Sequence, residues 1–391
     1  MTQQRDTETP ATPQATETTP RPHWAAWPDR PGAPSWTIGV EEEVMLVAAP
    51  GYNLAQAIDE VIPRLPSDIS GRVHRETHAA AVELATGVHT KVDEAIDDLR
   101  HLRRTMRQTC DPLELQVASS GTHPFAVSRE ITVTQGERQA AVYGSMRELA
   151  RREPTFALHV HVGFDDPEAA VKVYNRMRVH LPMLLALSAN SPFWQGRDTG
   201  LASSRTPLFQ AFPRVGVPRR FASFQEWVDT VDLLVSCEAF PDPTFLWWDV
   251  RIQPRVGTIE IRIMDAQITL DATRALVALV QTLAKMEHEE AWAEEASRSA
   301  PEVHDENRFL AARDGVQVSL IDPIQRRRVP LRERLDLLMP MLRPHAQDLG
   351  CEADLEAVDE LFAVPGAGYQ LRVARRAERL PGLVRQLSAE F

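Results

Sequence analysis

Lysine and cysteine are scarce in this chain of 391 residues, and both shortages limit what the protein can do. The only lysines are Lys91, Lys172 and Lys285, so arginine carries nearly all of the positive charge. The three cysteines lie far apart and form neither a CxxC motif nor a disulfide framework. This cysteine usage indicates a reducing compartment, and we expect a cytoplasmic protein.

The chain also lacks the features that bring a protein to a membrane or to nucleic acid. No apolar run approaches the roughly 18 residues of a membrane span, and no basic region followed by an apolar one suggests a secretory signal. The formal net charge of -12 argues against nonspecific binding of nucleic acid, which needs a basic surface. We therefore expect small-molecule partners, with no nucleic acid and no membrane.

Several common catalytic motifs are missing. Neither a GxxxxGKS/T loop nor a GxGxxG turn occurs, so a P-loop or Rossmann nucleotide site is unsupported. His288–Glu290 begins like the zinc motif HExxH but lacks the second histidine, and no Gly-x-Ser-x-Gly elbow occurs.

Composition divides the chain into a tail and a body. Residues 1–34 are rich in Thr, Pro and Gln and contain almost no aliphatic residues. Such a segment cannot bury enough apolar surface to offset its ordering entropy, so we expect a disordered tail that is dispensable for activity. Trp24 and Trp27 are expected to dock on the body. Residues 35–391 are expected to form a single catalytic domain.

The body mixes predicted strands and helices at irregular intervals. Apolar residues at helical spacing predict helices that include Asn53–Leu65, Lys91–Gln108, Pro167–Ala189 and Asp271–Glu295. Pro182 should kink the third of these helices. A regular alternation of strand and helix is absent, which indicates an α+β fold with a mainly antiparallel sheet.

Three of the predicted strands share one design, with an aliphatic face and an ionisable face. The ionisable pairs are Glu41 with Glu43, His159 with His161, and Glu260 with Arg262. One sheet face with carboxylates, histidines and arginines favours a site for metal ions and phosphate. Mainly oxygen ligands suit Mg²⁺ or Mn²⁺ better than Zn²⁺, and the guanidinium fork suits phosphoryl groups.

Each pair taken singly also has an ordinary explanation. Glu41 and Glu43 could form a solvated strand face, the histidines could be half-buried polar residues, and Glu260 and Arg262 could be a surface ion pair. The repetition of the pattern on three strands favours a functional site. Glu42 falls on the apolar face, where it needs a buried partner or a place at the sheet edge, and the sequence leaves this open.

Seven ordered motifs resemble those of the glutamate–cysteine ligase type 2 family, the carboxylate–amine ligases. They are Gly39–Glu43, Glu83–Gly87, Gly121–Phe125, His159–Gly163, Asn190–Gly196 with Ser203–Arg205, Trp248–Arg251 and Gly257–Arg262. Asn307–Arg308 and Ala312–Gly315 resemble a later segment of that family. The resemblance runs from about Trp36 to beyond Gly315, and the order of the motifs makes it specific at the level of the family.

The resemblance implies a glutamine-synthetase-like fold, in which an antiparallel sheet forms an open, funnel-like active site with helices packed behind it. It also implies an ATP-dependent ligase that uses Mg²⁺ or Mn²⁺. In such an enzyme ATP phosphorylates a carboxylate, typically the γ-carboxylate of glutamate. An amine, typically that of cysteine, then attacks the acyl phosphate to give an amide, ADP and phosphate.

The same resemblance implies roles for individual residues. The metal ligands would be Glu41, Glu43, Glu83, His161 and Glu260. Arg262 would contact the transferring phosphoryl group, with Glu260 beside it at the catalytic centre. Arg205 and Arg251 would hold phosphate or the donor carboxylates. His123 would line the substrate side of the site, and His159 the nucleotide side.

Two other functions stay open at this point. A metal-dependent hydrolase could use the HxH pair, although such enzymes usually need further His or Asp ligands at strand ends. A non-catalytic binding protein could retain the fold, although a decayed site would tolerate loss of the carboxylates. The motifs do not identify the amine acceptor. The long helices could form a homodimer interface, but core packing explains their apolar stripes equally well.

Overall fold

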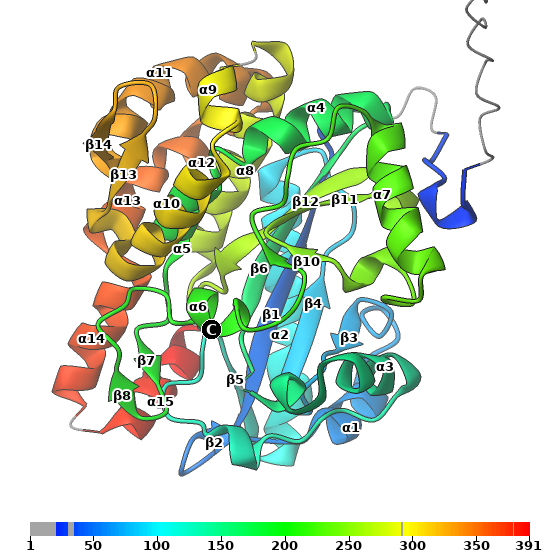
Figure 1. Ribbon diagram of the computed structural model, residues 1–391. Helices are drawn as coiled ribbons and strands as arrows, with labels where there is room; N and C mark the ends of the chain where they lie inside the picture. Colours follow the sequence, from blue (N-terminus) through cyan, green and yellow to red (C-terminus); the bar gives the residue numbers. More distant parts are fainter. Residues whose placement is uncertain (1–20, 30–34, 153, 291, 378) are drawn as a thin grey trace, which may run out of the picture.

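The computed structural model describes residues 21–29, 35–152, 154–290, 292–377 and 379–391. An antiparallel sheet occupies its centre, with strand order β11-β12-β6-β1-β4-β3 (Figure 1). β2 and β5 also pair with β1, and every pairing within this sheet is antiparallel. The strands are β1 Ile38–Ala48, β2 Asn53–Leu54, β3 Val73–Arg75, β4 Ala81–Ala85, β5 Leu115–Ala118, β6 Ala157–Gly163, β11 Val250–Gln253 and β12 Thr258–Asp265.

Helices pack against the aliphatic face of the sheet and form the main core with it. α2 (Val92–Cys110) packs on β1, β4 and β5, and α8 (Leu270–Glu289) packs on β6. α4 (Pro167–Met177) packs on β11 and β12, and α5 (Leu181–Ser188) also packs on β12. α8 is the central helix of this layer, because residues on nearly all of its sides are buried.

The remaining elements surround this core (Figure 1). The helices are α1 Ile58–Val61, α3 Glu137–Met146, α6 Arg205–Phe209, α7 Phe224–Ser236, α9 Glu295–Arg298, α10 Pro301–Asp314, α11 Leu331–Leu349, α12 Glu352–Glu356, α13 Val358–Ala363, α14 Gly366–Arg376 and α15 Leu380–Glu390. Short strands are β7 Phe193–Trp194, β8 Arg197–Asp198, β9 Val215–Gly216, β10 Trp247–Trp248, β13 Ser319–Asp322 and β14 Arg327–Pro330. Among the described helices, none is long and apolar enough to cross a membrane.

Three of the predicted helices differ in the structure. α8 ends at Glu289, short of the predicted end at Glu295. The chain leaves helical structure between α4 and α5, and Pro182 lies in the first turn of α5 rather than at a kink. Proline suits that position because the first-turn N–H has no partner within the helix. The segment Asn53–Leu65 pairs first with β1 as β2 and then forms only the short α1 and a 3-10 turn.

The predicted docking of the two N-terminal tryptophans is confirmed. Trp24 packs edge-on against Trp227, and Trp27 packs edge-on against Phe224 of α7. The indole N–H of Trp27 donates a hydrogen bond to the carbonyl of Phe164 at 3.1 Å. The other part of the predicted tail, residues 1–20 and 30–34, lies outside the described residues.

Strand alternation in β1 separates three consecutive carboxylates, and Glu42 has a buried partner. Glu42 is fully buried on the helical side, where Arg103 of α2 donates to its two oxygens at 2.7 and 2.6 Å. Arg103 also donates to the carbonyls of Gln267 and Ile268, both at 2.9 Å. The pair therefore joins β1, α2 and the segment that follows β12, on the opposite side of the sheet from Glu41 and Glu43.

Replacing Arg103 by Met should cost about 3–5 kcal/mol in the free energy of unfolding, because it leaves the Glu42 carboxylate buried without its partner. Urea denaturation followed by circular dichroism measures the change. Arg104→Met is the matched control, since Arg104 is exposed on the same helix. A loss in Arg103→Met no greater than in the control would contradict this assignment.

Candidate active site

A cavity of about 510 Å³ lies over the polar face of the sheet. Side chains from β1, β4, β6, β11 and β12 form its floor, and α3, α6 and residues 74–78 contribute to its walls. The charged side chains that line it include Glu41, Glu43, Glu76, Glu83, Arg205, Arg251 and Arg262. The cavity therefore brings together most of the residues that the sequence predicted.

The register of the strands explains this convergence. Glu41 of β1 pairs with His159 of β6, and Glu43 pairs with Glu83 of β4. One strand further along, His161 of β6 pairs with Glu260 of β12. Directly opposite residues in an antiparallel pair point to the same face with Cβ atoms about 5 Å apart. One short alternating motif in each strand is thus enough to form a cluster.

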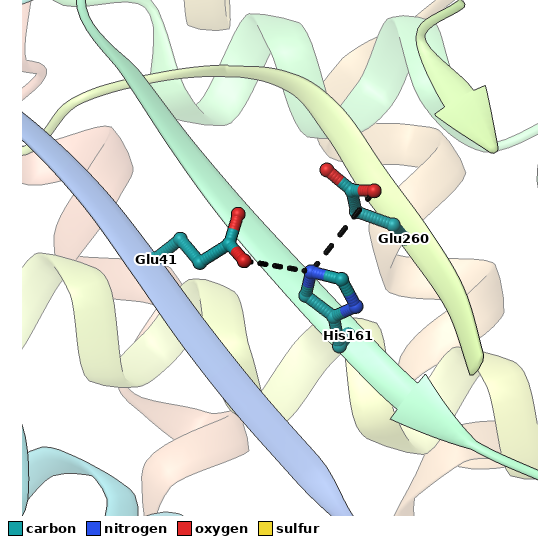
Figure 2. Close-up of side chains that lie close together, drawn as sticks. All are labelled: Glu41, His161 and Glu260. Atoms are coloured by element: carbon teal, nitrogen blue, oxygen red, sulfur yellow. Dashed lines mark ion pairs between the residues drawn. The ribbon is translucent and has the colours of Figure 1, made fainter. Parts of the chain in front are cut away.

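His161 lies between two carboxylates (Figure 2). Its Nε2 is 3.2 Å from Oε1 of Glu41 and 4.0 Å from Oε2 of Glu260. Its Nδ1 forms a hydrogen bond of 2.9 Å with the hydroxyl of Thr258. Burial lowers the pKa of His161, but the two carboxylates outweigh it and the net shift is upward. Burial raises the pKa of Glu41, but His161 and His159 outweigh it and hold the pKa well below its usual range.

Glu43, Glu76 and Glu83 form a second cluster, which consists only of carboxylates. One oxygen from each lies within 4.8 Å of the others. Burial raises the pKa of Glu43 to about 8, and Glu76 adds to the shift. Burial also raises the pKa of Glu83 well above its usual range, with further contributions from Glu41, Glu76 and Glu43. Carboxylates this close either retain protons or bind a cation.

The donor atoms fit a hard divalent cation. Three groups have ligand atoms within 4.8 Å of one another: Glu41 with His161 and Glu260, Glu41 with Glu83 and His159, and Glu43 with Glu76 and Glu83. Carboxylate oxygens with at most one imidazole in each group suit Mg²⁺ or Mn²⁺. Nε2 of His161 is buried and faces the oxygens of Glu41 and Glu260, so one cation at this place could take all three ligand atoms.

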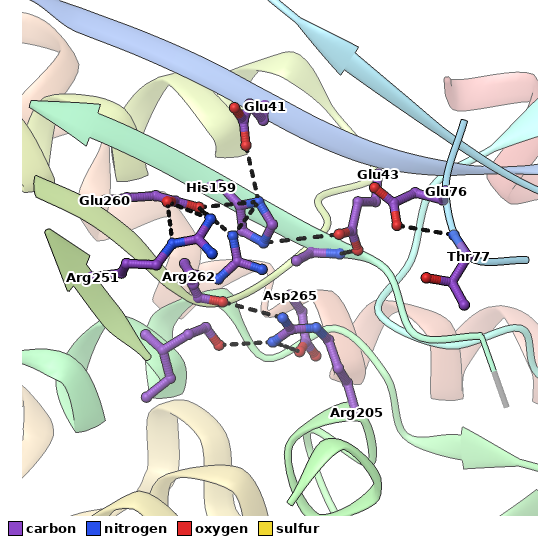
Figure 3. Close-up of polar contacts among 12 residues, drawn as sticks. Glu41, Glu43, Glu76, Thr77, His159, Arg205, Arg251, Glu260, Arg262 and Asp265 are labelled. Carbon is purple, nitrogen blue, oxygen red and sulfur yellow. Dashed lines mark hydrogen bonds and ion pairs between the residues drawn. The ribbon is translucent and has the colours of Figure 1, made fainter. Parts of the chain in front are cut away.

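Glu260 anchors two arginines beside these clusters (Figure 3). Arg251 donates to its two oxygens at 2.9 and 3.2 Å, and Arg262 donates from Nη1 to Oε1. Gln253 adds a bond of 2.7 Å. Burial raises the pKa of Glu260, but the two arginines outweigh it and hold the pKa far below its usual range. Glu260 is therefore ionised, and it fixes both guanidinium groups.

Arg205 reaches the same cavity from α6. It donates from Nη1 to the carbonyl of Ile263 and from Nη2 to that of Arg262, both at 3.1 Å. Nε of Arg205 and Nε of Arg262 are buried, and neither has a hydrogen-bond partner among the described residues. The cavity thus combines carboxylate clusters for cations with guanidinium donors for an anion.

The two remaining predicted histidines have different surroundings. His159 lines the cavity, with Nδ1 3.2 Å from Oε2 of Glu41. Burial lowers its pKa to about 4, and Arg262 adds to the shift, so this ring is neutral near pH 7. His123 is not brought to the cavity. Its Nε2 bonds the carbonyl of Tyr52 at 2.9 Å and its Nδ1 accepts from the N–H of Ala126 at 3.0 Å. The geometry gives His123 a role in holding its turn.

Sequence reasoning missed Glu76, and it did not single out Asp265. Glu76 follows the short β3 in a segment without clear periodicity, so no strand pattern indicated its direction. Asp265 ends β12 beyond an irregularity in the register between Ile261 and Met264. A bulge changes the face to which later residues point, so simple alternation does not predict the position of Asp265.

Two solved structures define the class of fold. The glutamate–cysteine ligase of Francisella tularensis in complex with AMP has a TM-score of 0.69 over 91% of this chain and 89% of that chain, at 12% identity. A bifunctional glutathione synthetase of Pasteurella multocida has a TM-score of 0.66 over 91% of this chain and 51% of that chain, at 16% identity. At such identities the likeness concerns the fold. It confirms the predicted α+β architecture with a mainly antiparallel sheet and helices packed against it.

Comparison of sequences gives the family. Residues 37–390 match the model of glutamate-cysteine ligase family 2. A Rubrobacter xylanophilus protein provisionally named glutamate–cysteine ligase 2-1 is 41% identical over 333 residues, which cover 84% of this chain and 88% of that protein. A Gloeobacter violaceus protein provisionally named glutamate–cysteine ligase 2 is 35% identical over 359 residues, 90% of this chain and 96% of that protein. The chain belongs to glutamate-cysteine ligase family 2, as the ordered motifs predicted.

Replacing Glu43 by Gln should stabilise the metal-free protein at high pH. Because the pKa of Glu43 rises to about 8 on folding, the folded protein retains a proton that the unfolded chain releases. The free energy of unfolding should therefore fall as the pH rises from about 5 to about 8, and Glu43→Gln should reduce this slope. Urea denaturation in EDTA across this range measures it.

Mg²⁺ or Mn²⁺ should restore the free energy of unfolding that the unmodified protein loses at high pH, because an ion that binds only the folded state stabilises it. The stabilisation should be much smaller in Glu43→Gln. Glu94→Gln, at an exposed position of α2, is the control. Equal slopes and equal cation effects in all three proteins would show that Glu43 is not part of a cation site.

Proposed function

We propose that the protein is an ATP-dependent carboxylate–amine ligase that activates the γ-carboxylate of glutamate and joins it to an amine such as that of cysteine. The observation that carries this proposal is the combination in one cavity of carboxylate clusters with Arg205, Arg251 and Arg262. A reaction between ATP and a carboxylate brings together two anionic groups, so it needs several positive charges at one place. Membership of glutamate-cysteine ligase family 2 supports the same reaction.

The carboxylate clusters would hold Mg²⁺ or Mn²⁺. Glu41, Glu43, Glu83, His161 and Glu260 are the ligands that the motifs implied. Glu76 joins them because one of its oxygens lies within 4.8 Å of oxygens of Glu43 and Glu83. Bound divalent ions would neutralise the phosphate charge of ATP and orient its γ-phosphoryl group. These residues supply the negative charge that the ions require.

The arginines would act on the anionic groups. Arg262 contacts the transferring phosphoryl group, and Arg251 holds nucleotide phosphate. Glu260 keeps both guanidinium groups in place, which supports a catalytic role for it besides metal binding. Arg205 holds phosphate or the donor carboxylate with the guanidinium N–H groups that do not bond backbone carbonyls, and neutral His159 lines the nucleotide side. Catalysis would then depend on positioning and electrostatic stabilisation, and no protein nucleophile is needed.

The bonds change in two steps. A γ-carboxylate oxygen forms a bond to the γ-phosphorus of ATP, and ADP leaves. The amine nitrogen then bonds to the acyl carbon, the carbon–oxygen bond to phosphate breaks, and the nitrogen loses a proton. The dependence on ATP, together with the scattered cysteines, suits a cytoplasmic enzyme.

With ATP, Mg²⁺ and glutamate present, the protein should release ADP when a suitable amine is added, and one ADP should form for each amide. A coupled ADP assay across a panel of amines, cysteine included, measures this, and mass spectrometry identifies the product. Hydrolysis of an amide without ATP would contradict the proposed ligase activity and would favour a metal-dependent hydrolase.

Arg262→Ala and Glu260→Gln should each lower kcat by about 100-fold or more. The first removes positive charge at the transferring phosphoryl group, and the second removes the carboxylate that fixes Arg251 and Arg262. Thermal unfolding checks that each variant is folded. Arg255→Ala is the matched control, since Arg255 is an exposed arginine between β11 and β12. Turnover in both variants within a factor of a few of the control would show that this strand face does not carry the chemistry.

A further inference from the structure

Asp265 is a buried carboxylate that does not belong to the described lining of the cavity. Its Oδ2 accepts hydrogen bonds from the N–H of Asn190 at 2.9 Å and from the hydroxyl of Ser191 at 2.7 Å. Its Oδ1 accepts from the hydroxyl of Ser203 at 3.0 Å. One carboxylate at the end of β12 thus holds two segments that are distant from it in sequence.

Both serines also form hydrogen bonds with residues at the start of α6. The hydroxyl of Ser191 accepts a hydrogen bond from the backbone N–H of Arg205 at 3.2 Å. The hydroxyl of Ser203 bonds that of Thr206 at 3.1 Å. Ser191 and Ser203 also form a parallel backbone bridge. The hydroxyl groups that Asp265 orients therefore fix the first turn of α6, whose first residue is Arg205.

The side chain of Arg205 returns to the same end of β12 (Figure 3). Its guanidinium group donates to the carbonyls of Arg262 and Ile263, and Nη1 lies 3.8 Å from Oδ1 of Asp265. Backbone and side chain of Arg205 are thus both fixed by the stretch that carries Arg262 into the cavity. The relative position of the two arginines depends on this one stretch.

Gly121 leaves the room that this arrangement needs. A Cβ atom at this position would lie 2.6 Å from Cγ of Asp265 and 2.9 Å from the hydroxyl of Ser191. Both distances are too short for non-bonded atoms, so any side chain would displace the carboxylate or the serine. This contact accounts for a glycine at the start of the Gly121–Phe125 motif, whose histidine lies outside the cavity.

We propose that Asp265 is the positioning residue for Arg205, and that it aligns this guanidinium group with that of Arg262 toward one anionic group in the cavity. The inference rests on the proposed function, in which Arg205 holds phosphate or the donor carboxylate. Asp265 acts through Ser191, Ser203 and Arg205 and does not touch the substrate.

Asp265→Asn tests this role, because it keeps the shape of the side chain and removes hydrogen-bond acceptors. We expect kcat/KM to fall by about 10- to 100-fold, since a displacement of about 1 Å in a positioning group has effects of this size. KM should rise for the same substrate, ATP or glutamate, for which Arg205→Ala raises it. The double variant Asp265→Asn with Arg205→Ala should have a kcat/KM no lower than that of Arg205→Ala alone, because Asp265 acts only through Arg205.

Glu287→Gln is the matched control for loss of a buried carboxylate. Glu287 is fully buried and bonds His180 and the backbone of Ala293. This control should lose stability but keep KM for both substrates. Gly121→Ala is a second variant that disturbs the same contacts without changing charge, and it replaces Asp265→Asn if that protein does not fold.

A crystal structure of Asp265→Asn separates this inference from the proposed function. We expect the Arg205 guanidinium group to leave the carbonyls of Arg262 and Ile263. If the unmodified protein forms no amide, the proposed function fails, and the crystal structure still decides the positioning role. An unmoved Arg205, or kinetic losses that multiply in the double variant, would overturn the inference.

Discussion

Mutual repulsion among carboxylates on one face of the sheet is the constraint on which the rest of the structure depends. Strand register brings Glu41, Glu43, Glu83 and Glu260 together, and Glu76 joins them from the wall. Two kinds of positive charge can relieve the repulsion. Arginines neutralise Glu260, as its strongly lowered pKa shows. Burial first, and neighbouring carboxylates second, raise the pKa of Glu43 and Glu83, which the arginines do not offset. In our account divalent ions supply the second kind of positive charge.

The reverse side of the sheet holds this arrangement in place. Glu42 points away from the cavity and pairs with Arg103, which also bonds the carbonyls of Gln267 and Ile268. Asp265, two residues before Gln267, accepts hydrogen bonds from Ser191 and Ser203, which fix the start of the helix that carries Arg205. The segment after β12 is therefore fixed from the helical layer, and the arginines on the other side depend on it. Fold stability and the geometry of the site are coupled through a few buried polar contacts.

Much of the site followed from strand alternation alone. Period-two patterns placed Glu41 with Glu43, His159 with His161 and Glu260 with Arg262 on one face, and the register confirms that these faces meet. Alternation also identified Glu42 as the carboxylate that needs a separate explanation. The family resemblance added Glu83, Arg205 and Arg251, which all line the cavity.

Other features could not be predicted, for physical reasons. Glu76 and the hydrogen bonds of His123 depend on irregular segments, where no periodicity fixes the direction of a side chain. The bulge in β12 makes alternation fail at Asp265. Pro182 can kink a helix or begin one, and only the packing of α4 and α5 decides between these outcomes. The buried partner of Glu42 comes from a distant helix, and the sequence of β1 contains no sign of it.

In the reaction that we propose, the cavity transfers a phosphoryl group to a carboxylate before the amide forms. Glutamate labelled with ¹⁸O in its γ-carboxylate tests this most directly, with mass spectrometry of the inorganic phosphate that the reaction releases. We expect each phosphate to carry one ¹⁸O atom, because the acyl carbon–oxygen bond breaks when the amine attacks. Amide formation with unlabelled phosphate would contradict the acyl phosphate and, with it, the role assigned to this face of the sheet.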